Sequence, residues 1–98
     1  MIVLEKELEA KLVKGVEQLG GLCLKWVCPG NSGVPDRIVL LPGGHVDFVE
    51  LKRPGKADLD PLQRVWQRTL SKTGFRVWLI NSEETLRAAL EAFQGVIE

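Results

Sequence analysis

Residues 33–52 read GVPDRIVLLPGGHVDFVELK, and this stretch carries the strongest indication of fold in the chain. Two runs rich in β-forming residues, Arg37 to Leu41 and His45 to Lys52, stand on either side of Pro42-Gly43-Gly44. A proline followed by two glycines between such runs is typical of a tight turn. The stretch therefore predicts an antiparallel β-hairpin.

The pairing register of this hairpin depends on the length of its turn. If the turn takes three residues, Leu41 pairs with His45, and the same register places Asp36 directly opposite Glu50. Residues paired in this way lie on one face of the sheet, with Cβ atoms roughly 4.5–5.5 Å apart. Lys52 follows two residues after Glu50 and shares that face. A two-residue turn or a bulge would shift the register and separate the two carboxylates.

The sequence on either side of the hairpin predicts three helices and two further strands. Apolar residues recur at helical spacing from Leu4 to Leu19, and Gly20-Gly21 ends that helix. The other expected elements are a strand at 21–28, a helix at 61–73, a strand at 75–80 and a last helix that begins after residue 82. The order α-β-β-β-α-β-α indicates an α/β fold, in which helices flank a mixed sheet because the β-α-β step requires a crossover.

The composition is that of one ordinary globular domain. The chain has 98 residues, of which 45% are hydrophobic and 27% are charged, so we expect a single domain over residues 1–98. The 13 basic and 13 acidic residues balance, and any basic surface must therefore come from uneven distribution. The first residues do not resemble a signal peptide, and no stretch approaches the roughly 20 apolar residues that span a membrane. We expect a cytoplasmic protein with no membrane partner.

The chemistry is indicated by the two carboxylates that the hairpin brings together. Asp36 and Glu50 would repel each other, and a hard divalent cation such as Mg²⁺ removes that repulsion. Such a cation readies a water molecule for attack and neutralises charge on a scissile phosphate. Lys52 adds a fixed positive charge on the same face. The alternative is a solvated sheet face that carries one ordinary Glu-Lys pair.

A third acidic group comes from the first helix, where two candidates remain open. The apolar side chains of that helix span an arc of about 120°, and Glu5 falls within this arc while Glu9 falls just outside it. A carboxylate on a core-facing stripe is costly unless something compensates its charge. Glu5 is therefore expected to approach the metal site, although a first-turn acidic residue favoured by the helix dipole explains it equally well.

These motifs together resemble a known family. Glu5 in a first helix, Gly33-Val34-Pro35-Asp36, the glycine turn, Glu50-Leu51-Lys52 and Pro61-Leu62-Gln63 occur in the order found in the PD-(D/E)xK nuclease superfamily. The chain is most similar to its VRR-NUC family, the virus-type replication-repair nucleases, from about residue 5 to residue 80. The resemblance implies a restriction-endonuclease-like core of order α-β-β-β-α-β, which agrees with the order expected above.

The resemblance also implies roles for individual residues. It assigns metal binding to Asp36, Glu50 and the backbone carbonyl of Leu51, with Mg²⁺ as the cofactor and Mn²⁺ as a substitute. It assigns further catalytic roles to Lys52, Glu5 and Gln63, although Gln63 is equally explained as the third residue of a capping box.

The activity that follows is that of a metal-dependent endonuclease hydrolysing DNA phosphodiester bonds. Stand-alone members of the family resemble homodimers that cut branched DNA such as four-way (Holliday) junctions, and this chain is expected to be of that type, encoded by a bacterium or a phage. The alternative is a nuclease-fold module that binds DNA or a protein partner without cutting.

Five residues are candidates for contact with DNA. They lie near the predicted site in sequence, and their side chains suit phosphate oxygens: Lys25, Ser32, Arg37, Arg53 and Lys56. A second set, Arg64, Arg68 and Lys72, forms a basic stripe along the predicted helix at 61–73. Such a stripe is more often a solvated helix face than a binding surface.

Overall fold

The computed structural model describes residues 4–97 and contains three helices and four strands in this part of the chain. Their order is α-β-β-β-α-β-α, as the sequence predicts. The elements are α1 (Glu5–Gln18), β1 (Leu22–Lys25), β2 (Arg37–Leu41), β3 (His45–Leu51), α2 (Pro61–Lys72), β4 (Arg76–Ile80) and α3 (Glu83–Val96). None of the helices within this described range is long and apolar enough to cross a membrane.

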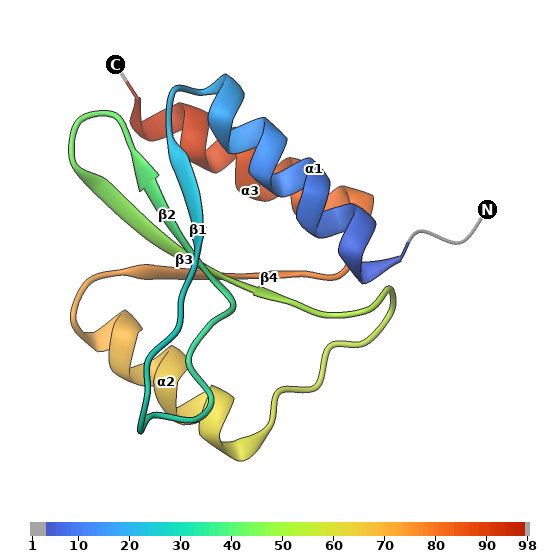
Figure 1. Ribbon diagram of the computed structural model, residues 1–98, viewed down its shortest axis with the longest axis vertical. Helices are drawn as coiled ribbons and strands as arrows, with labels where there is room; N and C mark the ends of the chain where they lie inside the picture. Colours follow the sequence, from blue (N-terminus) through green and yellow to red (C-terminus); the bar gives the residue numbers. More distant parts are fainter. Residues whose placement is uncertain (1–3, 98) are drawn as a thin grey trace.

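The strands form one mixed sheet in the order β1-β2-β3-β4 (Figure 1). Strands β1, β2 and β3 pair antiparallel, whereas β4 lies parallel to β3 because α2 carries the chain back across the sheet. Leu41 pairs with His45 at the turn, and Arg37 pairs with Val49 at the far end of the hairpin. The three-residue turn and its register are therefore confirmed.

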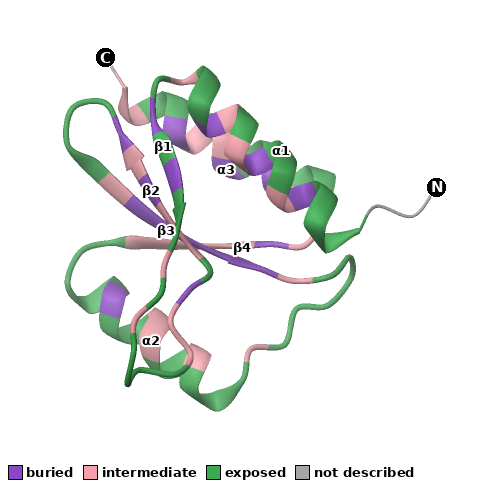
Figure 2. Cartoon of the chain, viewed as in Figure 1, coloured by how far each residue is buried: buried purple, intermediate pink, exposed green. Residues whose placement is uncertain are grey.

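Helices α1 and α3 lie side by side over one face of the sheet and enclose the main core (Figure 1). Leu8, Leu12 and Val16 recur every four residues along α1, and all three are completely buried. Phe93 of α3 is completely buried as well. Gly20, with a φ angle of +84°, ends the α1 segment in a conformation that suits glycine. Figure 2 shows that the buried residues gather between these two helices and the central strands.

The opposite face of the sheet carries α2 and a smaller aromatic cluster. The ring of Trp26 lies 4.8 Å from that of Phe48 and 6.2 Å from that of Trp66. Phe75, which precedes β4, meets Phe48 edge-on at 5.6 Å. The aromatic rings contribute apolar burial on this face, where Leu70 is the single buried residue of α2.

The strand expected at residues 21–28 is shorter than the sequence predicts. Regular pairing in β1 ends at Lys25, although the Trp26 amide still donates to the carbonyl of Asp36 at 3.0 Å. The chain then leaves the sheet and folds against the start of α2. Gly33 approaches so closely that a Cβ atom there would lie 2.7 Å from backbone carbon of Leu62. This close approach holds the β1–β2 loop beside α2, next to the first residue of the hairpin.

An ion pair on the α1/α3 face ties the edge strand β4 to the centre of the sheet. Asp47 of β3 is 2% exposed and lies opposite Arg76 of β4. The Arg76 guanidinium donates to both carboxylate oxygens, from Nε at 2.9 Å and from Nη2 at 2.7 Å. It also lies over the ring of Trp78, at 5.4 Å from the centroid. A buried carboxylate is thereby neutralised by a bidentate partner.

The Asp47–Arg76 pair, whose carboxylate is buried, should contribute more to stability than the exposed Lys11–Glu83 pair. Arg76→Met leaves Asp47 buried without its partner, and because the Arg76 side chain is 40% exposed, we expect a moderate loss of about 2 kcal/mol in the free energy of unfolding. Lys11→Met breaks the exposed pair between Lys11 and Glu83 and should cost less than about 1 kcal/mol. Urea unfolding measures both, and equal losses would contradict the role given to Asp47.

Candidate active site

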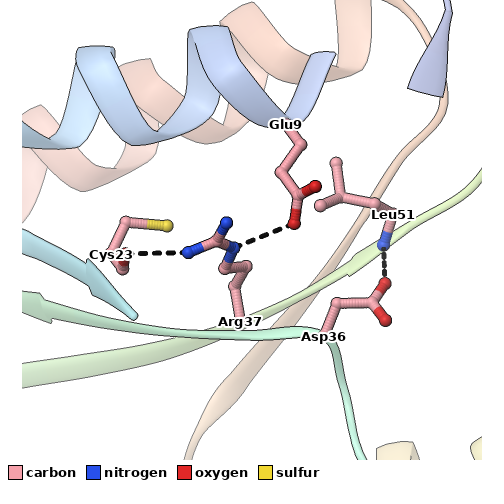
Figure 3. Close-up of polar contacts among 5 residues, drawn as sticks. All are labelled: Glu9, Cys23, Asp36, Arg37 and Leu51. Carbon is pink, nitrogen blue, oxygen red and sulfur yellow. Dashed lines mark hydrogen bonds and ion pairs between the residues drawn. The ribbon is translucent and has the colours of Figure 1, made fainter. Parts of the chain in front are cut away.

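The carboxylates of Asp36 and Glu50 meet where β2 begins and β3 ends. Continuing the observed register by one residue beyond the Arg37–Val49 pair places Asp36 opposite Glu50. The Asp36 carboxylate accepts a hydrogen bond from the backbone amide of Leu51, with 2.7 Å between Oδ2 and N (Figure 3). One oxygen of Asp36 is therefore fixed by the backbone of β3, and the two acidic side chains are held together by the hairpin itself.

Glu50 is in an environment that disfavours its charge. The residue is 6% exposed, and burial is the main reason that its pKa rises from an ordinary 4.5 to about 9. The adjacent Asp36 raises the pKa further through a hydrogen bond and its negative charge, and Glu5 adds a smaller contribution of the same sign. The charge of Lys52 lowers it but does not compensate. Additional positive charge close to Glu50 would favour its ionised form against burial and the two acidic neighbours.

The donor atoms at this place suit a hard divalent cation. In an extended strand the N–H and C=O of one residue point to the same side, so the Leu51 carbonyl faces the side on which its amide meets Asp36. Asp36, Glu50 and this carbonyl together offer only oxygen donors, which Mg²⁺ prefers. Within residues 4–97 no three histidine, cysteine, aspartate or glutamate side chains form a metal-binding cluster. One or two carboxylates, with water and phosphate oxygens, are an ordinary set for Mg²⁺.

Lys52 and Gln63 are brought together although they come from a strand end and a helix. The ammonium group of Lys52 donates to Oε1 of Gln63 at 2.9 Å. The same oxygen accepts the backbone amide of Asp60, also at 2.9 Å, which is the capping contact expected from the sequence. Gln63 therefore caps α2, as the sequence predicts, and the same side-chain oxygen also binds the ammonium group of Lys52.

The structure separates the two acidic residues of α1 that the sequence left as alternatives. Both line a cleft of about 320 Å³ that also includes Asp36 and Leu51. Glu9 forms an ion pair with Arg37, with 3.0 Å between Oε2 and Nε. Glu5 is exposed and makes no ion pair among residues 4–97, and its charge contributes to the raised pKa of Glu50. The Glu5 carboxylate is thus unpaired within residues 4–97, but it does not lie on the core-facing stripe where the sequence places it, and Glu9 is the more buried of the two.

Four of the five candidate DNA contacts are exposed. Lys25 lies on the rim of the same cleft, Ser32 lies in the β1–β2 loop, and Arg53 and Lys56 lie in the loop that follows β3. Arg37 differs, because its side chain is 13% exposed and turns toward α1 rather than solvent.

Two features of this region were not anticipated from the sequence. The inward direction of Arg37 could have been inferred from strand alternation, because it shares a face with Val39 and Leu41 of the core. The pairing of Asp47 with Arg76 could not, since it depends on the parallel register between β3 and β4, which no local motif specifies.

Comparisons with known proteins agree with this geometry. No protein-family model matches the chain. It is 39% identical over 83 residues to "Putative nuclease p44" of Acyrthosiphon pisum secondary endosymbiont phage 1, covering 85% of this chain and 88% of that protein. A solved structure described as a VRR_NUC domain superposes with a TM-score of 0.85 at 31% identity, covering 91% of this chain and 96% of the other. The chain therefore belongs to the VRR-NUC nuclease family.

Proposed function

We propose that the chain is a Mg²⁺-dependent endonuclease that hydrolyses DNA phosphodiester bonds. The observation that carries this proposal is the buried Glu50 carboxylate beside Asp36, whose pKa is raised to about 9 when only protein groups surround it. A fold gains nothing from a buried Glu50 carboxylate placed against the exposed carboxylate of Asp36, whereas a cation can use both. Because the chain belongs to a nuclease family, the substrate that we propose for this site is DNA.

Each residue of the site has a physical role in this proposal. Asp36, Glu50 and the Leu51 carbonyl would hold the cation, which supplies positive charge to the scissile phosphate and polarises the attacking water. Lys52 places a second positive charge near the phosphate, and its bond to Gln63 limits its movement. Glu5 adds negative charge at the mouth of the cleft, where it can bind a water molecule of the cation.

Contact with the DNA backbone is proposed for the basic rim of the site. Lys25 stands at one side of the cleft, and Arg53 and Lys56 stand in the exposed loop after β3. Ser32 in the β1–β2 loop can donate to a phosphate oxygen. Because the formal net charge of the whole chain is zero, binding must depend on this local surface and should weaken steeply with salt.

A symmetric homodimer acting on branched DNA is the form that we propose for the active enzyme. Resolving a four-way junction needs two paired cuts, and a two-fold dimer offers two sites with the symmetry of the junction. An uncovered apolar sheet face supports the proposal. Leu22 and Leu24 of β1, which are 54% and 45% exposed, lie beside Leu40 and Ile38 of β2 on the side opposite the main core. A contiguous apolar surface of this kind suits a partner.

Single substitutions at the site should separate metal binding from catalysis. Asp36→Ala and Glu50→Ala should each lose Mg²⁺ binding and reduce cleavage by more than about 100-fold, because each removes a ligand. Lys52→Met should keep Mg²⁺ binding but lower turnover by a similar factor, since it removes charge at the phosphate. Asp58→Ala, in the exposed loop after β3, is the matched control. Calorimetry with Mg²⁺ and cleavage of a labelled junction measure the two properties, and wild-type cleavage by Asp36→Ala would refute the assignment.

The stability of the metal-free protein should depend on pH through Glu50. Between pH 4.5 and about 9 Glu50 is ionised in the unfolded chain but protonated in the folded chain, so rising pH favours unfolding throughout this window. Glu50→Gln cannot ionise, and its stability relative to wild type should therefore increase as pH rises through the window. Added Mg²⁺ should stabilise wild type and leave Glu50→Gln little changed. Thermal unfolding with a chelator, with Glu17→Gln as an exposed control, measures the effect; a difference independent of pH would count against a buried Glu50.

A charge placed on the uncovered sheet face should disrupt the proposed dimer. Leu24→Glu places a charge on the uncovered sheet face and should yield a monomer that cuts junctions poorly, because two simultaneous sites are lost. Gln94→Glu, an exposed change on α3 across the sheet, should leave a dimer. Light scattering and junction cleavage are to be measured on the same preparations. A monomeric wild type that cuts linear duplex as readily as junctions would exclude the dimeric form and leave the metal site unaffected.

A further inference from the structure

Arg37 is the most connected charged side chain next to the site. Figure 3 shows it reaching from β2 up to α1, where Nε lies 3.0 Å from Oε2 of Glu9. Its Nη1 atom donates to the backbone carbonyl of Cys23 in β1 at 3.2 Å. One guanidinium group therefore joins α1, β1 and β2. The Arg37 side chain is 13% exposed and that of Glu9 is 30% exposed, so solvent screens the pair only in part.

The positions of the two partners in the chain relate this pair to the candidate site. Arg37 directly follows Asp36, whose carboxylate is fixed by the Leu51 amide and whose carbonyl is fixed by the Trp26 amide. Glu9 lies one helical turn after Glu5 on the same side of α1, and both line the cleft. The ion pair thus connects α1, one turn after Glu5, to the start of β2 beside Asp36.

The pair is not needed to hold α1 on the sheet. Leu8, Leu12 and Val16 are completely buried beneath the helix and supply its main apolar contact. A partly buried ion pair adds little net stability, because desolvation offsets most of the attraction, but its geometry is specific. The planar guanidinium is held by both a carboxylate and a carbonyl. It therefore restricts translation of the helix along its axis and rotation about that axis more than apolar contacts do.

We propose that the Glu9–Arg37 ion pair is a positioning device that holds Glu5 at the site of Asp36 and Glu50. The inference rests on the proposed nuclease function and identifies two further residues that it needs. Glu9 is occupied by Arg37 and does not bind the cation. Arg37 is occupied by Glu9 and the Cys23 carbonyl and does not bind DNA phosphate. Both residues act through Glu5.

Kinetics distinguish this role from a direct contact with DNA. Glu9→Gln and Arg37→Met should each lower kcat about tenfold or more and change KM by less than about twofold, since misplacing a group at the site slows the reaction without removing a substrate contact. Arg37→Lys should restore part of kcat, because lysine reaches one of the two acceptors. If Arg37 bound phosphate, Arg37→Met would raise KM, and Glu9→Gln would free the arginine and lower KM.

A double-mutant cycle tests whether the pair acts through Glu5. In a Glu5→Gln background, adding Glu9→Gln should change kcat by less than about threefold, because the group that the pair positions is already altered. Lys11→Met is the matched control, since it breaks another ion pair of α1, to Glu83, on the side away from the site. That variant should leave kcat unchanged. Additive losses from Glu5→Gln and Glu9→Gln would overturn the proposal.

A measurement without metal or DNA provides an independent readout. Hydrogen exchange of backbone amides in the first two turns of α1 should be faster in Glu9→Gln and Arg37→Met than in wild type, while amides near Val16 keep their protection. Unchanged exchange in the first turns would overturn the proposal. A failure of the proposed function appears differently, because wild-type protein would then not cleave DNA although the exchange results would still hold.

Discussion

The register of the β2–β3 hairpin is the constraint on which both the core and the site depend. With Leu41 opposite His45, the odd-numbered residues Val39, Val49 and Leu51 face α1 and α3 and are buried there. The same register puts Asp36 and Glu50 together on the opposite face. A slip of one residue would turn the carboxylates into the main core and the apolar side chains out of it, at a cost that neither face could offset.

The main core lies on one face of the sheet, and the buried acid Glu50 lies on the other. The face covered by α1 and α3 holds nearly all of the completely buried side chains. On this face the Asp47–Arg76 pair joins β3 to β4. The side of α2 is more open and contains Glu50, an acid whose burial is unfavourable while only protein surrounds it. A large core on one face stabilises a chain that carries this unfavourable group on the other.

Much of this arrangement could be predicted because its determinants are local. The Pro42-Gly43-Gly44 turn specifies the hairpin register, and Asp60 with Gln63 specifies the start of α2; both predictions are confirmed. The inward direction of Arg37 was not predicted, although strand alternation places this residue on the core face beside Val39 and Leu41. Its partner Glu9 depends on how α1 docks, which is a property of the assembled core rather than of any segment.

The parts of the site are joined by chain segments of very different kinds. Asp36 and Glu50 are brought together by the β2–β3 hairpin, whose turn has three residues, and closing so short a turn costs little entropy. The contact of Glu9 with Arg37 spans the whole distance from the first helix to the second strand, and β4 joins the sheet only through a crossover. Local contacts form faster than distant ones during folding. On the proposed function, a newly made chain would form its pair of carboxylates early. It would become able to cut DNA only when the last long-range contacts had formed. Partly folded chains would therefore not cut DNA.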